Sequence, residues 1–297
     1  MNIVFASDNS YLEHLAVSMC SLFENNQGAS FDVYIVNANI DKGSWRELEL
    51  LTRRYGHNLI DVKIVDYEVD GLVTSHHFTK ANYYRLFIPE KIPVQKALYL
   101  DADIVVTGSI SELYSTSLDG YYLAAVIDPG FKRHADLGMS EDSKYFNSGV
   151  MLLNLEAWRR DDIKIKVIDV VKHKPWAIQA VDQCGLNSVV NGQWKELHPQ
   201  FNLQGALFDN PGHEFSDLFP GDDLLAALQS PVIIHFSGSL KPWSFRYKHP
   251  WRKLYWKYLR MTPFSHWFSK DLTLFNIVKW SLPKGIKQAI KSKFRQE

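Results

Sequence analysis

Apolar residues along the chain fall into short runs that alternate with segments of helical periodicity. The runs predict strands at Ile3–Ser7, Phe31–Ala38, Ile60–Asp66, Ala97–Val106, Tyr122–Asp128, Gly149–Leu155 and Pro231–Phe236. The periodic segments predict a helix that begins near Tyr11 and further helices at Asp41–Tyr55, Lys80–Phe87, Leu155–Lys174 and Gln179–Val190. Because strands and helices alternate, we expect an α/β fold with a mostly parallel central sheet that helices cover on both faces.

The first predicted helix has two candidate start signals. Ser10 is followed three residues later by Glu13, which is the spacing of a capping box. Asp8 is also a suitable cap residue for the same helix. The pattern alone does not choose between the two.

Polar residues follow four of the predicted strands at their ends. They are Ser7-Asp8-Asn9, Asp101-Ala102-Asp103, Asp128 and His235. Ligands of such sheets bind beyond the carboxyl ends of the strands, so these groups predict one shared site. The chain contains neither GxGxxG nor GxxxxGK[ST], and the phosphates of a bound nucleotide would therefore need another source of positive charge.

The stretch LYLDADIVV, residues 98–106, sets two acids inside an apolar run. Ionised carboxylates are costly to bury without a partner. Residues i and i+2 of a strand share a face, so Asp101 and Asp103 are expected to point at one place and to share a cation. Oxygen ligands favour Mg²⁺ or Mn²⁺, and the imidazole of His235 as a third ligand favours Mn²⁺. On spacing alone, a surface turn or an ordinary salt bridge fits the two acids as well.

Charge is unevenly distributed although the formal net charge is zero. From Arg246 onward there are 13 Lys or Arg against 2 Asp or Glu. Residues 251–260 and 284–296 read as basic amphipathic helices with aromatic residues, a pattern typical of segments that lie on an anionic membrane. For 251–260, packing on the preceding domain is an equal alternative. We see no fold or aromatic platform for nucleic acid, so no nucleic-acid partner is expected.

Other features of the sequence favour a reducing compartment. Cys20 and Cys184 are the only cysteines, and they form neither a metal spacing nor a disulfide framework. The start MNIVFASDNS lacks the basic region of a signal peptide, and no uninterrupted apolar stretch is long enough to span a membrane. We therefore expect a cytoplasmic protein.

Six blocks in order carry a resemblance to a known family. They are IVFASDNSY (3–11), NYYRLFIPE (82–90), LYLDADIVV (98–106), FNSGVMLLNLEAWRR (146–160), VDQ (181–183) and HFSGSLKPW (235–243). Together they resemble the family 8 retaining glycosyltransferases, particularly the bacterial enzymes that add α-linked galactose or glucose to lipopolysaccharide. The resemblance implies a GT-A fold, a UDP-sugar donor and Mn²⁺, with Mg²⁺ as an alternative.

The resemblance also implies roles for single residues. Asp101, Asp103 and His235 are expected to bind the metal. Around the donor, Ala6, Asp8 and Tyr11 would hold the uridine, Ala102 would line the nucleotide site, Gly238 and Lys241 would contact the diphosphate, and Arg85, Asn147, Asp182 and Gln183 would surround the sugar. Asp128 would face the acceptor. Ser10 departs from the family pattern, which often has Asn at that position.

Plainer roles exist for several of these residues when the resemblance is set aside. His235 fits a buried core histidine, and Arg85 fits a surface pair with Glu90. Asp182 and Gln183 fit exposed helix positions, and Asn147 fits a turn.

The sequence thus predicts a GT-A catalytic domain over residues 1–245 and a basic, helical membrane-association region over 246–297. The expected activity is transfer of galactose or glucose from a UDP-sugar to lipopolysaccharide or a similar surface glycan, with retention and by front-face attack. The expected location is the cytoplasmic face of the membrane. Competing hypotheses are a metal-dependent nucleotide-sugar hydrolase or nucleotidyltransferase, and a protein that binds a nucleotide sugar without turnover.

Overall fold

The computed structural model describes residues 1–65, 69–72, 80–209, 215 and 218–282. A central sheet runs through this part of the chain in the order β3-β2-β1-β4-β7-β6-β8. Its strands are β1 (Asn2–Ala6), β2 (Asp32–Asn37), β3 (Asn58–Lys63), β4 (Lys96–Leu100), β6 (Leu123–Ile127), β7 (Phe146–Asn154) and β8 (Trp194–Glu196). Only β7 runs antiparallel to its neighbours, so the expected mostly parallel sheet is confirmed.

A second, smaller sheet corrects one prediction. The run Ala97–Val106 is not one strand: β4 ends at Leu100, and β5 (Ile104–Val106) pairs instead with β10 (Ile233–His235). β10 also pairs in parallel with β9 (Leu203–Gln204). Because the chain leaves one sheet and enters another, Asp101 to Asp103 form a turn between strands, and the argument that both acids share one face of a strand was wrong.

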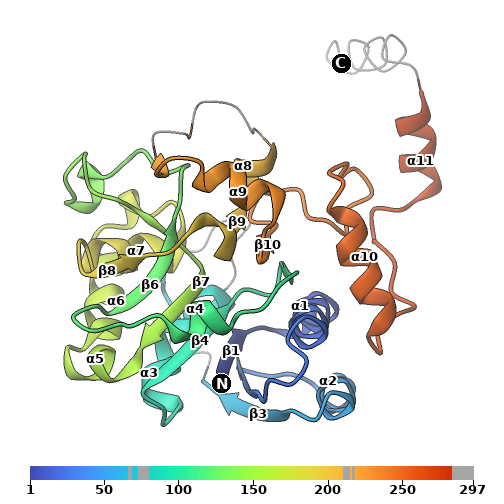
Figure 1. Ribbon diagram of the computed structural model, residues 1–297, viewed down its shortest axis with the longest axis horizontal. Helices are drawn as coiled ribbons and strands as arrows, with labels where there is room; N and C mark the ends of the chain where they lie inside the picture. The colour runs from blue at the N-terminus through green and yellow to red at the C-terminus, as the bar shows by residue number, and fades with distance from the viewer. Residues whose placement is uncertain (66–68, 73–79, 210–214, 216–217, 283–297) are drawn as a thin grey trace.

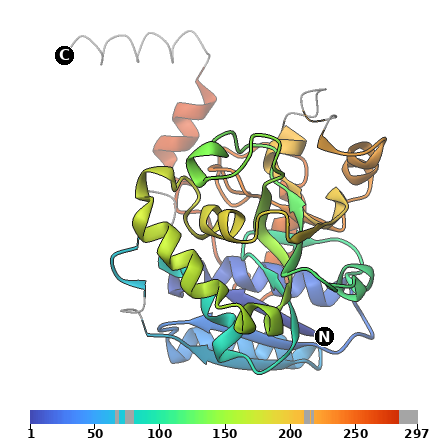
Figure 2. The same ribbon diagram turned by 90° about the vertical axis from the view of Figure 1, so that its left-hand side faces the viewer.

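Helices cover both faces of the central sheet. Figures 1 and 2 show α1 (Leu12–Glu24) and α2 (Lys42–Arg54) on one side, and α5 (Leu155–Arg160) and α6 (Ile163–His173) on the other. The remaining helices are α3 (Ile88–Lys91), α4 (Ser111–Ser115), α7 (Val181–Val189), α8 (Gly205–Asp209), α9 (Asp223–Gln229), α10 (Arg252–Met261) and α11 (Leu274–Ser281). None of the described helices is long and apolar enough to cross a membrane.

Several predicted helices differ from the observed ones in local detail. Lys80–Phe87 is a 3-10 helix, η3, that runs into α3. The single helix expected from Leu155 is two helices, because Asp162 adopts a left-handed conformation (φ 51°) between α5 and α6. α2 ends as predicted before Gly56, whose φ of 73° favours glycine. Pro175 begins a short 3-10 turn, η5 (Pro175–Ala177), after α6 has ended.

The start of the first helix is capped by Asp8. One carboxylate oxygen of Asp8, Oδ1, accepts hydrogen bonds from the Ser10 amide at 2.9 Å and the Ser10 hydroxyl at 2.5 Å. A 3-10 turn, η1 (Asn9–Tyr11), then leads into α1, which has no side-chain cap of its own. The capping box of Ser10 and Glu13 is therefore wrong, since the Ser10 hydroxyl donates to Asp8.

The helix α1 is buried on all sides. Every residue from Leu12 to Phe23 except Glu13 is buried. One side of α1 faces the sheet, and α10 covers another, as Figure 1 shows. Tyr255 of α10 bonds His14 at 2.7 Å, and Asn25, next to α1, donates to the Tyr258 hydroxyl at 2.8 Å. The apolar face of the 251–260 segment therefore packs on α1, so the alternative that this segment packs on the preceding part of the chain is confirmed.

The described end of the chain continues away from this body. α11 extends beyond α10 (Figure 1) and exposes Leu274, Ile277 and Val278. The second predicted amphipathic segment, 284–296, lies outside the described residues.

Candidate active site and metal-binding cluster

One cavity of about 830 Å³ gathers the residues singled out in the sequence. All of them line it: Ala6, Asp8, Tyr11, Arg85, Asp101, Ala102, Asp103, Asp128, Asn147, Asp182, Gln183, His235, Gly238 and Lys241. The polar ends of the four predicted strands thus meet at one site. Their individual roles remain predictions.

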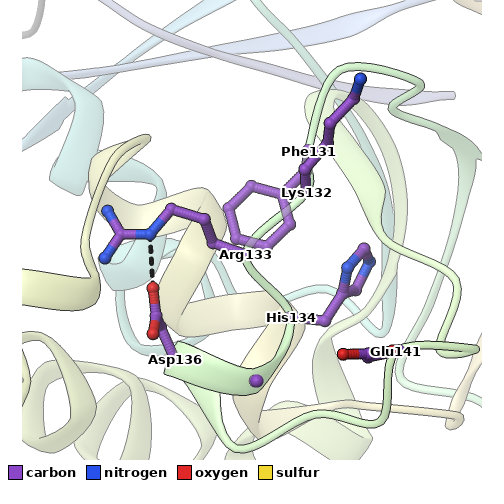
Figure 3. A pocket seen from close by; sticks show the side chains of 7 residues that line it. Phe131, Lys132, Arg133, His134, Asp136 and Glu141 are labelled. Carbon is purple, nitrogen blue, oxygen red and sulfur yellow. Dashed lines mark hydrogen bonds and ion pairs between the residues drawn. The ribbon is translucent and has the colours of Figure 1, made fainter.

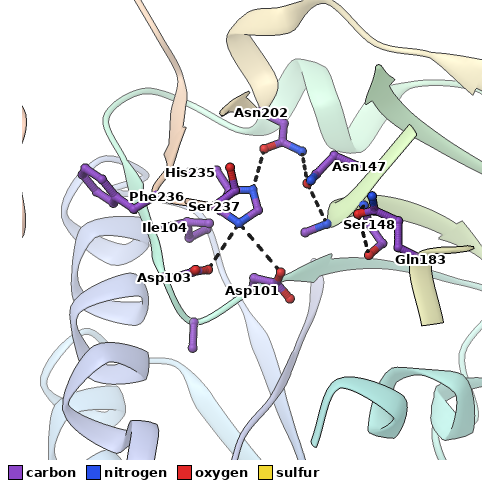
Figure 4. Close-up of polar contacts among 12 residues, drawn as sticks. Asp101, Asp103, Ile104, Asn147, Ser148, Gln183, Asn202, His235, Phe236 and Ser237 are labelled. Carbon is purple, nitrogen blue, oxygen red and sulfur yellow. Dashed lines mark hydrogen bonds and ion pairs between the residues drawn. The ribbon is translucent and has the colours of Figure 1, made fainter. Parts of the chain in front are cut away.

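Asp101, Asp103 and His235 form a compact cluster of possible metal ligands. One ligand atom from each lies within 4.8 Å of the others. His235 Nε2 is 3.3 Å from Asp103 Oδ1 and 3.8 Å from Asp101 Oδ2, and all three side chains converge in Figure 4. Two backbone hydrogen bonds fix the turn that carries both acids: Asp101 N–H donates to Gly149 O (2.8 Å), and Phe236 N–H donates to Asp103 O (3.0 Å).

Positive charge beside Asp103 keeps this acid ionised. Lys241 Nζ lies 2.6 Å from Asp103 Oδ2 and also donates to the Phe236 carbonyl at 2.8 Å. Burial opposes ionisation of Asp103, but Lys241 and His235 outweigh burial and hold the pKa of this carboxyl well below its usual range. A negatively charged ligand atom of this kind suits a hard divalent cation.

The three possible metal ligands have room to converge because position 149 is a glycine. A methyl group on Gly149 would lie 2.2 Å from His235 Cε1 and 2.9 Å from Asp101 Oδ2. Only glycine therefore leaves both ligands in place. Two carboxylates and one imidazole are also a donor set that Mn²⁺ accepts.

Arg85 is a buried cation between two acids. Its Nη2 lies 3.1 Å from Asp101 Oδ1, its Nε lies 3.1 Å from Asp182 Oδ2, and its guanidinium covers the Tyr99 ring at 4.5 Å. Nη1 donates to the Ser148 carbonyl at 2.8 Å. The surface pair with Glu90 is excluded, because Arg85 is only 3% exposed.

Asp182 pairs imperfectly with this arginine. Its Oδ2 is buried without a hydrogen bond, despite lying 3.1 Å from Arg85 Nε. Burial raises the pKa of Asp182 to about 7; Arg85 opposes the rise and Asp101 adds to it. Near neutral pH this carboxyl is therefore partly protonated.

The residue before Asp182 is held in an unfavourable conformation. Val181 has φ of 33°, in the left-handed region where a β-branched residue is strained. It begins α7 and leads directly to Asp182 and Gln183, so the strain accompanies the turn that brings these two side chains to the cavity.

Gln183 and Asn147 both donate hydrogen bonds to Asp128. Gln183 Oε1 accepts from the Ser148 amide at 2.9 Å, and Gln183 Nε2 donates to Asp128 Oδ2 at 2.9 Å. Asn147 Nδ2 reaches the same oxygen at 3.3 Å. Neither residue takes the exposed helix or turn position that the residues alone allow, because both are mostly buried.

An aromatic cluster supports the other end of the cavity. Tyr11 packs edge-on against His14 and Trp243, whose rings stack on each other at 3.5 Å. Burial raises the pKa of Tyr11 above its ordinary value and lowers the pKa of His14 to about 3. Both groups are therefore neutral at physiological pH, and the cluster acts as an apolar wall.

Sequence reasoning missed several residues that shape the site. Gly149 acts through the space it leaves, Tyr99 donates to Asp101 Oδ1 at 2.7 Å, and Asn202 contacts His235. Gly149 was visible only as a member of the FNSGVMLLNLEAWRR block, and Asn202 belonged to none of the blocks.

A second, more open cavity of about 530 Å³ lies in the β6–β7 connection. Figure 3 shows its lining, in which Phe131 and His134 face charged side chains and Arg133 pairs with Asp136. Two bases, Lys132 and Arg133, and two acids, Asp136 and Glu141, line it, so it has no dominant charge. Its location shortly after Asp128 places it beside the main site along the chain.

Comparisons with known proteins agree with this geometry. The model of the family described as glycosyl transferase family 8 matches residues 2–246. General stress protein A of Bacillus subtilis is 32% identical over 89% of this chain and 95% of its own length. The lipopolysaccharide 1,2-glucosyltransferase of Escherichia coli is 26% identical over 84% of this chain and 73% of its own length. Other curated relatives are longer, and this chain spans 64% of one and 30% of another.

A solved structure confirms the fold. The galactosyltransferase LgtC, crystallised with donor and acceptor sugar analogues, superposes with a TM-score of 0.81 at 24% identity. The match covers 89% of this chain and 96% of LgtC. The chain therefore has the expected GT-A fold.

We expect Gly149→Ala to disrupt the cluster of possible metal ligands, because the added methyl group would overlap His235. Mn²⁺ affinity, measured by titration with electron paramagnetic resonance, should fall by about 10- to 100-fold. Gly108→Ala is the matched control, since its added methyl group meets Val232 at an ordinary 3.5 Å. Equal Mn²⁺ affinity in Gly149→Ala and the unaltered protein would remove this glycine from the site.

Proposed function

The chain belongs to glycosyl transferase family 8, and from this premise we propose that it transfers a hexose from a UDP-sugar to a glycan hydroxyl with retention. The observation that carries the proposal is the arrangement of charge in the main cavity. Asp101, Asp103 and His235 form a cation site beside Lys241. Arg85 and Gln183 stand on the β7 side, where polar groups suit a sugar.

The donor would lie across the cavity from the aromatic cluster to Gln183. Tyr11 offers a ring for the uracil and Asp8 a carboxylate, while Ala6 leaves space beside them. Gly238 has open space at its α-carbon, which allows close approach of a diphosphate. Lys241 lies next to that position and adds positive charge.

A divalent metal would be held by Asp101, Asp103 and His235. When bound, Mn²⁺ or Mg²⁺ supplies Lewis-acid stabilisation to the departing diphosphate. Lys241 would act on the same charge, because a preorganised cation stabilises an anion that develops as UDP leaves. Ala102 would line the nucleotide side of this turn.

Retention of configuration is best served by front-face attack. The bond from the anomeric carbon to the UDP oxygen breaks, and the acceptor oxygen bonds to the same face of that carbon. The acceptor's proton passes to the departing UDP oxygen. In this scheme Asp128 and Gln183 orient the reactants, and Arg85 supports the donor sugar.

The alternative, a covalent sugar–enzyme intermediate, needs an available nucleophile. Gln183 is an amide, and both ends of it are hydrogen bonded. Asp182 is 1% exposed and has a raised pKa, so its carboxyl is a poor nucleophile. Asp128 already accepts from Gln183 and Asn147. These contacts favour the front-face route.

For the substrates, we propose galactose or glucose as the sugar and lipopolysaccharide or a similar surface glycan as the acceptor. The support is the names of two similar proteins, a galactosyltransferase and a lipopolysaccharide glucosyltransferase. Galactose and glucose differ only in the configuration at C4.

We also propose that the chain binds the anionic, cytoplasmic face of a membrane through residues after α10. The apolar face of α10 is occupied by α1, which leaves the later residues for this role. Leu274 and Val278 on α11 are 77% and 53% exposed, and the segment beyond is rich in lysine. We therefore keep residues 246–297 as one proposed functional region, although α10, which belongs to this region, packs on α1.

We expect UDP release from UDP-galactose or UDP-glucose that needs both Mn²⁺ and a lipopolysaccharide fragment. Asp103→Ala should reduce it by at least about 100-fold, because the Lewis acid contributes several kcal/mol to leaving-group stabilisation. Asp119→Ala, a change at an exposed acid, is the control. Release without any acceptor would point to a hydrolase, and no release with any donor would overturn the proposal.

Intact-protein mass spectrometry tests the front-face route. With donor and Mn²⁺ but no acceptor, we expect only the unmodified mass, because no side chain becomes glycosylated. A mass increase of one hexose on the unaltered enzyme, formed and consumed at the rate of turnover, would establish the covalent route instead.

Membrane binding is tested by co-sedimentation with vesicles that contain anionic lipid. The double variant Leu274→Asn and Val278→Asn should bind less, because both side chains are exposed apolar groups on α11. Ile165→Asn, at a site 60% exposed on α6, is the matched control and should bind like the unaltered protein. Undiminished binding of the double variant would exclude α11.

A further inference from the structure

We propose that Asn202 is a positioning residue that fixes which nitrogen of His235 faces the metal. Asn202 lies in the turn before β9, is fully buried and does not itself line the donor cavity, although it contacts two residues that do. It stands in a chain of side chains that runs from Asp128 through Asn147 to His235, part of which Figure 4 shows. The inference deepens the proposed function and rests on it for the presence of the metal.

The hydrogen bonds in this series of side chains have fixed donors and acceptors, because both ends of the Asn147 amide have partners of known kind. The backbone amide of Gly149 can only donate, and it donates to Asn147 Oδ1 at 3.0 Å. The carboxylate of Asp128 accepts, and Asn147 Nδ2 donates to it at 3.3 Å. These two contacts decide how the Asn147 amide is oriented.

The orientation of Asn202 then follows from that of Asn147. Asn147 Oδ1 also faces Asn202 at 2.9 Å, and only the Nδ2 group of Asn202 can donate to it. The carbonyl oxygen of Asn202 is thereby directed to His235 Nδ1, 3.0 Å away. An amide oxygen there can only accept a hydrogen bond, so His235 carries its proton on Nδ1 and donates it to Asn202.

The consequence for His235 is a lone pair on Nε2. In a neutral imidazole only one nitrogen is protonated, and the partner of one nitrogen sets the state of the other. Nε2 is the atom that faces Asp101 and Asp103, at 3.8 and 3.3 Å. A metal ligand needs a lone pair at this position.

The two acids alone would favour the opposite tautomer. Asp103 Oδ1 lies close enough to Nε2 to attract a proton to it, which would close the ligand position. Asn202 opposes this effect from the far side of the ring. His235 is 3% exposed and Asn202 is fully buried, so bulk water cannot readily replace the contact.

The chain also joins the metal cluster to the sugar end of the cavity. Asp128 Oδ2, which accepts from Asn147, also accepts from Gln183 at 2.9 Å. The Ser148 amide fixes the direction of Gln183 in the same way that the Gly149 amide fixes Asn147. Two successive backbone amides therefore orient both side-chain amides that meet at Asp128.

Two substitutions at Asn202 separate positioning from a purely structural role. Asn202→Leu removes the acceptor, so the proton of His235 is free to move to Nε2. Asn202→Asp keeps an oxygen at Nδ1, and its carboxyl group can accept there whether or not it is protonated. A buried carboxyl group is nevertheless the more disruptive change for packing.

We expect the metal affinity and the stability of the two variants to follow opposite orders. The Mn²⁺ dissociation constant should rise by about 10- to 100-fold in Asn202→Leu and by less than about tenfold in Asn202→Asp. In urea unfolding, Asn202→Asp should be the less stable of the two. Asn37→Leu, the same change at a fully buried amide in β2, should leave Mn²⁺ affinity unchanged.

The tautomer itself is read by nitrogen NMR of ¹⁵N-histidine-labelled, metal-free protein at pH 8, with His235→Gln to assign the signals. We expect a protonated Nδ1 in the unaltered protein and in Asn202→Asp, and a protonated Nε2 in Asn202→Leu. An unchanged Nδ1–H signal in Asn202→Leu, or Mn²⁺ affinities that follow stability, would overturn the proposal.

The same measurements distinguish this inference from the proposed function. If the unaltered protein shows Nδ1–H and binds Mn²⁺ but turns over no UDP-sugar, the proposed reaction fails and the positioning role stands. If turnover is normal and the tautomer does not respond to Asn202, the positioning role fails alone. If the unaltered protein does not bind Mn²⁺, both are overturned.

Discussion

The passage of one apolar run from the central sheet into the smaller sheet is the constraint on which the site depends. β4 ends at Leu100, β5 begins at Ile104, and the three residues between them must turn. The strands on either side are buried, which holds the turn at the seam between two sheets. Two carboxylates are thereby kept partly out of water, and they require positive charge nearby. Lys241 supplies that charge and His235 a hydrogen-bonding partner. They come from just after β10 and from β10 itself, the strand that pairs with β5, so the same pairing that splits the run supplies its partners.

Charge around the seam is divided between two kinds of cation. Lys241 meets Asp103 from the more exposed side, with 20% of its side chain exposed, whereas Arg85, which is 3% exposed, meets Asp101 from the interior. The planar guanidinium lies over Tyr99 and bonds Ser148, so it is committed to its place. Lysine is a flexible point charge with fewer geometric demands. The interior arginine thus holds the turn between β4 and β5 in shape, and Lys241, which is held by Asp103 and the Phe236 carbonyl, keeps a positive charge at the cavity.

Most strands and the long helices could be predicted from the sequence because each has a strong pattern of its own, whereas the short strands β8 and β9 have too few residues for one and were not predicted. The split of Ala97–Val106 could not, since a buried run looks the same whether its two halves pair in one sheet or two. The cap at Asp8 was misassigned because Ser10 satisfies the same spacing rule and the competition is decided by geometry. Asp8, Asp101, Asp103, Asp128 and His235 were predicted from the polar ends of the strands, and the other lining residues came from the family resemblance, which recognises side chains that touch a ligand. Gly149 acts by leaving space for two possible ligands, and Asn202 acts by contacting His235. Neither role produces a pattern in the neighbouring sequence.

The complete burial of α1 has a consequence for how the protein is made. Ribosomal synthesis produces this helix long before α10, because its partner Tyr255 lies 241 residues later than His14. Domains generally fold as their chains emerge, and apolar surface exposed in the meantime is prone to aggregate. The side of α1 that α10 covers therefore stays uncovered until α10 has been translated. The packing of α1 is therefore completed only when α10 has been synthesised, late in the making of the domain that α1 helps to begin.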